Sequence, residues 1–343
     1  MAEVKPKEGT LFIQSKIFIV CELAQTHEGS LPLAKMLIKA ASLAKADAVK
    51  VQVFTADELA APSYKHFELF KQLEWPETSW QEVIAYSHAC GIKILADVFG
   101  EQSLAMLVRN GIDGLKIHAT DMRNTRLLNA LAHVDLPLLL SVGGGTVQEA
   151  KTAISLINRG GRTSPIVLMH GFQSYPTLVE HTHLNKMRYF KDQLGFPVGF
   201  ADHIDGNHHL NFALCAAAVG MGAVVIEKHI TLSRALKMED YESALGPEEF
   251  AEFVEKLREL NKSLGAYSED MSPAELYYRQ DTRKHVVAAV PIKSGHIISE
   301  LDVTLRRAGS LEEPSDLEDV LGKKTAREYE VNDILLAKDL ASV

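Results

Sequence analysis

The segment Val224–Thr231 (VVIEKHIT) carries a run of β-branched apolar residues into charged and imidazole side chains. Such a run is typical of a buried parallel strand with polar residues at its carboxyl end. Because side chains alternate along a strand, Glu227 and His229 face one way and Lys228 faces the other. A carboxylate and an imidazole that converge on one point could move a proton or hold a metal ion. Taken alone, this stretch is better explained as a strand end that enters solvent.

The same pattern, a short apolar run that ends in His, Asp, Glu or Lys, recurs along most of the first 230 or so residues. The predicted strands are 17–22, 48–54, 92–99, 114–118, 136–141, 165–170, 196–201 and a last one from 223. Predicted helices lie between them at 31–45, 80–90, 101–110, 126–132, 147–158, 183–194 and 209–219. Eight strand–helix units in about 250 residues predict an α/β fold, the TIM (β/α)8 barrel. A doubly wound dinucleotide fold is disfavoured because the first turn, LAQTHEGS, lacks its glycine pattern.

Active sites of such barrels lie on the rim formed by the carboxyl ends of the strands. The polar residues that end the predicted strands are Glu22, Lys50, Gln52, Asp97, Lys116, His118, Ser141, His170, Asp202, His203, Glu227 and His229. Polar residues with only structural roles would be distributed over both ends of the barrel. The concentration at one rim therefore predicts an enzyme.

Two of these histidines, His203 and His229, end neighbouring strands, with Glu22 and Glu227 expected nearby. Two imidazoles with carboxylate and water could hold Mn²⁺, Fe²⁺, Zn²⁺ or Mg²⁺ and leave positions open for substrate oxygens. The alternative is that one histidine only forms hydrogen bonds with its neighbours.

Lys50 and Lys116 would provide a positive pocket for a phosphate or carboxylate in an otherwise acidic chain. Each could instead pair with a rim carboxylate such as Asp97 or Asp121, and either could form a Schiff base with a carbonyl substrate. The glycine run 143–145 would let backbone N–H groups approach an anion, although a tight turn explains it equally well.

The chain is expected to have two domains. Residues 1–264 would form the barrel, 265–284 a linker with a short helical piece, and 285–343 a small β-rich domain. The last segment is too short to bury much core unaided, so we expect it to dock on another surface. Residues 1–16 are expected to be a loose lead-in, and 55–78 an insertion with a small aromatic core.

The net charge of −9 argues against nucleic acid or an anionic membrane as a partner, because both attract basic surfaces. No apolar stretch reaches the roughly 18 residues of a membrane-spanning helix, and the first residues do not resemble a signal peptide. We therefore expect a cytoplasmic protein. Cys21, Cys90 and Cys215 are isolated in apolar surroundings, which favours buried free thiols.

Several motifs, taken in order, resemble the sialic acid (N-acetylneuraminate) synthase family, which includes spore-coat polysaccharide synthases. They are Glu22, His27–Ser30, Lys50 with Gln52, Lys116 with Ile117, Leu140 with Ser141, His170, Tyr175–Thr177, Asp202 with His203, and Glu227–His229. The resemblance covers nearly the whole chain. The tail is similar to the antifreeze-like (SAF) domain of that family, with Arg307-Ala308-Gly309 where the family carries Arg-Pro-Gly.

This resemblance implies condensation of phosphoenolpyruvate with an N-acylated, mannosamine-type amino sugar in surface polysaccharide biosynthesis. It implies a divalent metal, Mn or Mg, held by His203 and His229, and a domain-swapped homodimer in which Arg307 reaches the partner's sugar site. Catalytic roles would fall to Glu22, Glu227 and Lys116. Contacts to substrate would come from Lys50, Gln52, Ser141, His170, Tyr175, Asp202, Asp240 and Arg307.

The sequence departs from the family pattern at clustered positions. The family's Ser-Thr-Pro-Phe is Ala96–Phe99 here, which introduces Asp97, and Gly-Ser-Gly/Ala-Glu becomes His118–Asp121. Further changes are Ala201 for Ser, Gln173 for Asn, and Met238–Asp240 for Gly-Pro-Asp. Loss of hydroxyl donors and gain of a negative charge should weaken binding of an anionic donor by several kcal/mol. The alternatives are a metal-dependent or Schiff-base aldolase or lyase that uses another carbonyl donor, and a non-catalytic sugar-binding relative.

Overall fold

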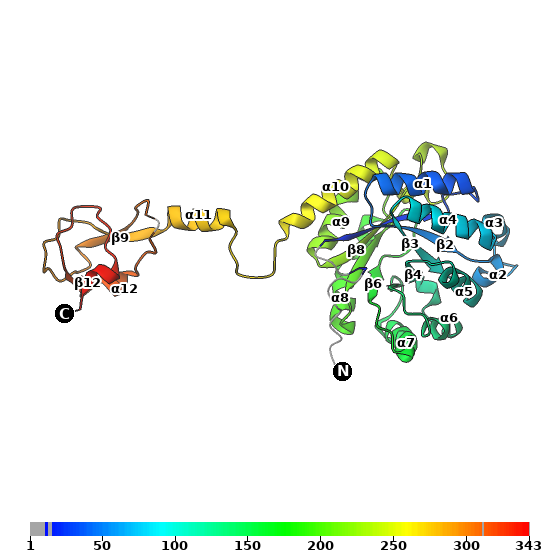
Figure 1. Ribbon diagram of the computed structural model, residues 1–343, viewed down its shortest axis with the longest axis horizontal. Coiled ribbons are helices and arrows are strands. Elements are labelled where there is room, and N and C mark those ends of the chain that lie inside the picture. Colours follow the sequence, from blue (N-terminus) through cyan, green and yellow to red (C-terminus); the bar gives the residue numbers. More distant parts are fainter. Residues whose placement is uncertain (1–10, 13–15, 311, 343) are drawn as a thin grey trace. The chain divides into compact units, whose positions relative to one another are not determined.

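The computed structural model describes residues 11–12, 16–310 and 312–342 of the chain (Figure 1). The chain divides after Gly265 into two compact units, which are described separately below.

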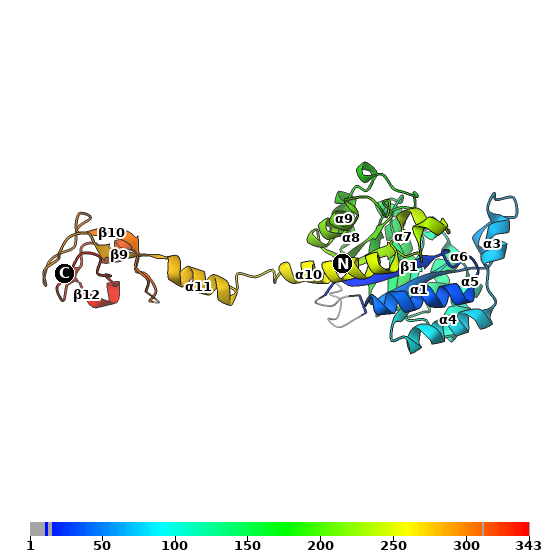
Figure 2. The same cartoon turned by 90° about the horizontal axis from the view of Figure 1, so that it is seen from above.

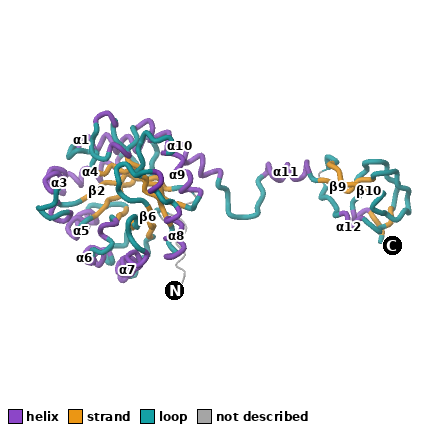
Figure 3. The backbone as a smooth tube through the Cα atoms, turned by 180° about the vertical axis from the view of Figure 1, so that it is seen from behind, coloured by secondary structure: helices purple, strands orange, loops and turns teal. Residues whose placement is uncertain are grey.

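The first unit is a closed barrel of parallel strands in sequence order, with β8 paired to β1 (Figure 3). The strands are β1 (Phe18–Ala24), β2 (Ala48–Val53), β3 (Lys93–Val98), β4 (Gly114–Ile117), β5 (Leu138–Ser141), β6 (Ile166–His170), β7 (Val198–Asp202) and β8 (Ala223–His229). The predicted TIM barrel is confirmed, and each strand lies within a few residues of its expected position.

Helices surround this barrel (Figure 3). They are α1 (Leu31–Leu43), α4 (Glu77–Ala89), α5 (Glu101–Arg109), α6 (Thr125–Leu131), α7 (Val147–Ile157), α8 (Asn185–Leu194), α9 (Asn211–Gly220) and α10 (Pro247–Ser263). Short 3-10 turns occupy Ala119–Asp121, Asn158–Gly160, Val179–His181, Arg234–Leu236 and Tyr241–Ser243. The apolar faces of the helices pack on the outward side chains of the strands in one continuous core. Neighbouring helices also pack on each other, and α1 and α4 lie side by side (Figure 2). Lys35 of α1 forms an ion pair with Glu82 of α4.

A second core fills the inside of the barrel. Its members are Phe12, Phe18, Val20, Ala48, Leu95, Leu139, Val167, Met169, Ala201 and Val225. Phe12 is fully buried, and its ring lies edge-on to that of Phe18 at a centroid distance of 5.2 Å. The expectation of a loose lead-in is therefore wrong at Phe12, because burial of this apolar ring in the barrel interior is more favourable than its exposure to water. The rest of that prediction concerns residues 1–10 and 13–15, which lie outside the described residues.

The insertion after β2 contains α2 (Ala56–Leu59) and α3 (Phe67–Leu73). Phe54, Leu73 and Phe99 form a small buried cluster there, with Phe70 packed against it. The predicted aromatic core of this insertion is confirmed.

The second unit contains α11 (Pro273–Thr282), the antiparallel pair β9 (Lys284–Ala288) and β10 (Val303–Arg307), α12 (Leu317–Val320), and the antiparallel pair β11 (Lys324–Thr325) and β12 (Leu340–Ala341), with a 3-10 turn at Ala337–Asp339. Its core consists of Val286, Ala288, Ile292, Ile298, Val303, Val320, Tyr329 and Leu335. The predicted β-rich tail is confirmed, and α11 is the short helical piece expected between the two domains. The linker role of residues 265–284 stays a prediction.

None of the helices that the structure describes has both the length and the apolar character needed to cross a membrane. The three cysteines carry free thiols. Cys21 and Cys215 are buried as expected, and Cys90 is partly exposed.

The barrel interior generates a prediction about stability. Phe12→Ala should lower the free energy of unfolding by about 3–5 kcal/mol, because it removes a fully buried aromatic ring and leaves a cavity. Phe12→Leu, which keeps most of the apolar volume, should cost clearly less. Urea denaturation followed by circular dichroism measures both, and a loss below about 1 kcal/mol for Phe12→Ala would show that the ring contributes little.

Candidate active site

A cavity of about 240 Å³ opens at the carboxyl ends of the barrel strands. Its lining residues are Glu22, Lys50, Gln52, Asp97, Lys116, His118, Ala119, Thr120, Ser141, Gly143, Gly171, Phe172, Gln173, Ala201, His203, Glu227 and His229. We call it the main cavity. It lies on the rim that the sequence predicted, and it brings together most of the predicted site residues.

Strand register explains why charged residues meet in this cavity. Lys50 of β2 lies beside Glu22 of β1, and Asp97 of β3 lies beside Lys116 of β4. His229 of β8 lies beside Glu22 in the pair that closes the barrel. Glu22, Lys50 and Asp97 each follow an inward-facing apolar residue two positions earlier, which is Val20, Ala48 or Leu95. In β8, Glu227 follows Val225 in the same way, and His229 continues the alternation. The same alternation that fills the barrel interior therefore directs the polar side chains into its mouth.

The two lysines of the main cavity are both paired. The Lys50 ammonium contacts the carboxylates of Glu22 and Asp97 and lies 3.8 Å from Glu227 Oε1. Lys116 Nζ donates to Glu227 Oε1 at 2.6 Å. Lys50 and the three carboxylates have side chains at most 2% exposed. Pairing with rim carboxylates, one of the alternatives that the sequence left open, is thus observed for both lysines.

Burial and charge pull the pKa values of this cluster in different directions. Burial raises the pKa of Glu22 to about 8, and the Lys50 ammonium only partly opposes this. Burial also disfavours the charged forms of Glu227 and Asp97, but Lys116 and Lys50 outweigh it and hold the pKa of each carboxyl below its ordinary value. Near neutral pH the cluster therefore holds a protonated Glu22 beside two ionised carboxylates and two lysines.

The two predicted metal-ligand histidines lie together. The ring centroids of His203 and His229 are 5.2 Å apart, and the Tyr175 ring lies edge-on to them at 5.5 Å and 5.8 Å. His203 Nδ1 donates to the carbonyl oxygen of Ala201 at 3.1 Å, which leaves its Nε2 with a free lone pair. Burial lowers the pKa of His203 to about 4 and that of His229 well below its ordinary value. Both rings are therefore neutral, the form that binds metal ions.

This donor set fits a divalent metal held by two imidazoles. Among the described residues, His229 Nδ1 and Glu227 Oε2 are buried without a hydrogen-bond partner. No group of three histidine, cysteine or acidic side chains in the described part of the chain could hold an ion by itself. The remaining coordination positions would therefore have to come from substrate and water.

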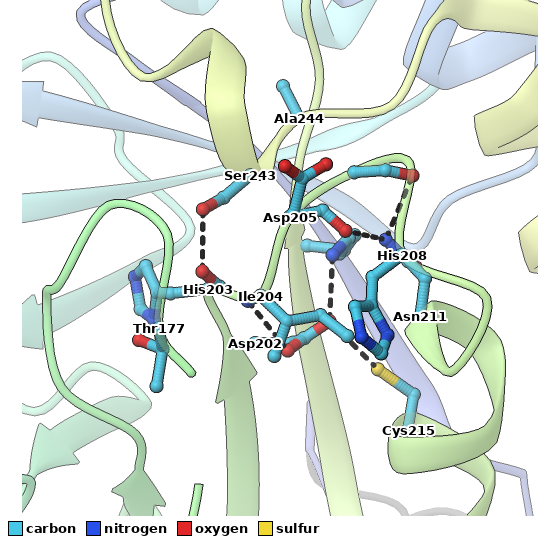
Figure 4. A network of polar contacts seen from close by, with 12 residues as sticks. Thr177, Asp202, His203, Ile204, Asp205, His208, Asn211, Cys215, Ser243 and Ala244 are labelled. Carbon is cyan, nitrogen blue, oxygen red and sulfur yellow. Dashed lines mark hydrogen bonds and ion pairs between the residues drawn. The ribbon is translucent and has the colours of Figure 1, made fainter. Parts of the chain in front are cut away.

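The backbone of His203 is held from two sides. Its carbonyl oxygen accepts hydrogen bonds from the Thr177 N–H at 2.8 Å and from the Ser243 hydroxyl at 2.6 Å (Figure 4). These bonds link the ends of β6 and β7 to the loop after β8. The imidazole is thereby fixed at the mouth without using either ring nitrogen.

Asp202 does not line the main cavity. Its carboxylate accepts hydrogen bonds from Lys228 Nζ at 2.7 Å and Ile204 N at 3.2 Å, and Cys215 Sγ lies at 3.7 Å (Figure 4). Alternation along β7 directs Ala201 inward and Asp202 outward toward α9. This placement disfavours the direct contact between Asp202 and substrate that the sequence predicted.

The other predicted substrate contacts are more dispersed. Gln52 lines the main cavity and accepts a hydrogen bond from Gln25 Nε2 at 3.1 Å. His170 lines a separate cavity, and Asp240 lies in the loop after β8 at the start of a 3-10 turn. Arg307 is exposed in the second unit, at the end of β10.

Sequence reasoning did not single out Gly171 or Phe172, which line the main cavity in the loop directly after β6. Their only signal is their position just beyond a strand end. Ala119 and Thr120, which line the cavity in the loop after β4, were noted only as departures from the family pattern.

Comparison with known proteins gives consistent matches over nearly the whole chain. The sequence profile of the NeuB family matches residues 37–269, and that of the SAF domain matches residues 283–341. N,N'-diacetyllegionaminic acid synthase of Legionella pneumophila is 31% identical over 97% of this chain and 96% of its own length. Pseudaminic acid synthase of Campylobacter jejuni is 28% identical over 96% of this chain and 98% of its own length.

A crystal structure of N-acetylneuraminic acid (sialic acid) synthetase from Leptospira borgpetersenii, in complex with citrate, has a TM-score of 0.71 to this chain. The two are 30% identical, and the match covers 77% of this chain and 91% of that one. The expected SAF domain and synthase-family fold are confirmed.

Asp240 generates a prediction about pH and stability. Burial, with Glu239 beside it, raises its pKa from 3.8 to about 6. The native state thus holds the proton more tightly than the unfolded state, and stability falls as pH rises between these two values. Asp240→Asn removes the ionisable group, and with it this fall in stability as pH rises. Asn also tolerates the positive φ of 62° at this position.

The variant should therefore be more stable than the natural protein by about 1–3 kcal/mol at pH 7, and the difference should shrink toward zero near pH 4. Thermal melts across this pH range measure the effect, with the exposed Asp57→Asn as control. Equal stability of Asp240→Asn and the natural protein at pH 7 would refute the shifted pKa.

Proposed function

The chain belongs to the NeuB family, and we propose that it condenses phosphoenolpyruvate with an N-acylated aldose to form a sugar acid for surface polysaccharide. The observation that carries this proposal is the meeting, in one buried cavity, of two neutral imidazoles and a cluster of two lysines and three carboxylates. Each group suits one part of such a condensation, and the relatives named above are synthases.

In the proposed reaction, C3 of the enol phosphate attacks the aldehyde carbon of the open-chain sugar, and the new C–C bond forms. Water then adds at C2, and the C2–O bond to phosphate breaks as inorganic phosphate leaves. A divalent ion held by His203 and His229 would supply Lewis-acid polarisation of the aldehyde. The native ion is proposed to be Mn²⁺ or Mg²⁺.

The side chains of the cavity have distinct roles in this proposal. Glu22 carries a proton near neutral pH and can pass it to the aldehyde oxygen as that oxygen gains charge. Glu227 orients Lys116 through their 2.6 Å contact, and the two lysines attract the donor's anionic groups. In this proposal Ser141, which lines the cavity, contacts the donor, and the sugar is held by Gln52, which also lines the cavity, and by Tyr175, whose ring contacts that of His229.

The Schiff-base alternative receives less support from the geometry. Lys116 donates to an ionised carboxylate at 2.6 Å in a buried site. This contact engages the lysine nitrogen that would have to attack the carbonyl carbon to form a Schiff base. An aldolase mechanism through Lys116 would first have to break this pair.

The proposal extends to the assembly. Arg307 lies in the SAF domain, and we propose that it completes the sugar site of a partner subunit in a domain-swapped homodimer. A cytoplasmic location, where phosphoenolpyruvate is made, accords with this function.

The activity itself is testable with the full chain, Mn²⁺, phosphoenolpyruvate and a panel of N-acylated aldoses. We expect release of inorganic phosphate together with a product of summed carbon skeleton, detected by mass spectrometry. His229→Ala should lose Mn²⁺ binding and turnover together, whereas His133→Ala, an exposed histidine before β5, should change neither. Turnover that survives both a chelator and His229→Ala would refute the metal-dependent synthase.

Asp97 generates a separate prediction about the donor. Its carboxylate pairs with Lys50 and competes with any anion for that ammonium. Asp97→Ser should therefore bind phosphoenolpyruvate about tenfold more tightly, because it removes a negative charge and adds a hydroxyl donor. Calorimetric titration of the Mn²⁺-loaded protein measures this, and Lys50→Ala should abolish the binding. Weaker binding by Asp97→Ser would mean that Asp97 supports the donor site.

A further inference from the structure

A second cavity of about 410 Å³ lies beside the main one, at the carboxyl ends of β5 and β6. It is lined by Val142–Gln148, His170, Phe172, His181, His183, Lys186, Tyr189 and Phe190. Gly143 and Phe172 line both cavities. The loops that separate them are tightly packed, because a Cβ on Gly143 would collide with the carbonyl oxygen of Gly171. The two cavities are therefore neighbours that share one wall.

The charge of the second cavity differs from that of the main one. Lys186 and three histidines line it, and no carboxylate lines it among the residues that the structure describes. It also receives the first turn of α7, where the N–H groups of Val147 and Gln148 have no acceptor within the helix and carry its partial positive charge, while the N–H of Glu149 donates to Thr146 Oγ1 at 3.2 Å. Glu149 in that turn is held in a capping box, where it accepts hydrogen bonds from the N–H and hydroxyl of Thr146 at 2.9 Å and 2.8 Å.

His170 supplies an independent sign of a ligand. Its side chain is only 4% exposed, and Nε2 lies 2.8 Å from the carbonyl oxygen of Thr182. A carbonyl can only accept, so Nε2 carries the hydrogen. Burial lowers the pKa of this histidine, so Nδ1 carries a lone pair. Within the described residues this buried Nδ1 has no partner, which is costly unless a ligand donates to it.

These groups favour a ligand that combines two chemical features. The amino end of α7 and Lys186 favour an anion, and phosphate suits a helix amino terminus through its several acceptor oxygens. Nδ1 of His170 needs a hydroxyl or another donor, which a simple carboxylate lacks. The volume of about 410 Å³ leaves room for a carbon skeleton beside the anionic group.

We propose that the second cavity binds a small phosphate ester that also carries hydroxyl groups. Its phosphate lies against Lys186 and the first turn of α7, and a hydroxyl donates to Nδ1 of His170. Monohydrogen phosphate has the same two features in a smaller form. The inference goes beyond the proposed synthase reaction, because it concerns binding outside the main cavity and is testable without turnover.

The test is calorimetric titration of the full chain with mannose 6-phosphate, inorganic phosphate and mannose. Mannose 6-phosphate should bind, and mannose should not. Lys186→Gln should weaken binding at least about tenfold, the value of one charge-assisted hydrogen bond. Arg188→Gln is the matched control, because Arg188 carries the same charge on α8, is exposed, and is not among the lining residues.

A further variant separates this site from the main cavity. Lys116→Gln, which should disable the proposed synthase, should leave binding of mannose 6-phosphate unchanged. Equal affinity for inorganic phosphate would support the site and identify the phosphate group as the whole ligand. The proposal is overturned if neither phosphate compound binds, or if binding is lost in Lys116→Gln and kept in Lys186→Gln.

Discussion

The burial of Lys50 is the constraint on which the rest of the site depends. This ammonium is 1% exposed, so it can exist there only with carboxylates in contact. Glu22 and Asp97 contact it from the two neighbouring strands, and Glu227 lies 3.8 Å away across the barrel. Removing one of these partners leaves the buried ammonium with less negative charge around it, which an anionic ligand would then have to supply.

A second layer of charge lies behind the first. Lys228 and Asp202 are fully buried on the outer faces of β8 and β7, directly next in sequence to His229 and His203. Their ion pair joins the two strands from outside, while the two imidazoles meet inside. The distance between the imidazoles is thus set by strand pairing and by a buried salt bridge. Neither restraint uses a ring nitrogen, so both rings stay available to a ligand.

Much of the fold and site could be predicted because a parallel barrel converts sequence order into position. An apolar run with a polar end places Glu22, Lys50 and Glu227 on one rim, whatever the loops do. Two of the predicted substrate contacts were chosen from strand ends without regard to strand faces, and the structure places them outside the main cavity. His170 and Asp202 both end strands, but both follow outward-facing residues, Leu168 and Phe200, so they point away from the barrel axis.

Other features had no usable signal in the sequence. Phe12 is a lone aromatic in a segment without periodicity, and only the completed barrel gives it an apolar interior to enter. His181 and His183 of the second cavity lie far along the segment after β6, and Lys186 lies in the first turn of α8, so spacing from the strand fixes neither their direction nor their depth. Such residues can be assigned to a cavity only when the positions of the segments that carry them are known.

The two cavities differ in a way that bears on substrate choice. In the main cavity each lysine is already neutralised by the protein, so a strongly anionic donor must compete with Asp97 and Glu227 for it. In the second cavity Lys186 is exposed and no carboxylate lines the described wall. Binding of a phosphate group therefore has a smaller electrostatic cost in the second cavity than in the main one. Because Gly143 and Phe172 belong to both walls, a ligand in the second cavity lies directly beside the main cavity.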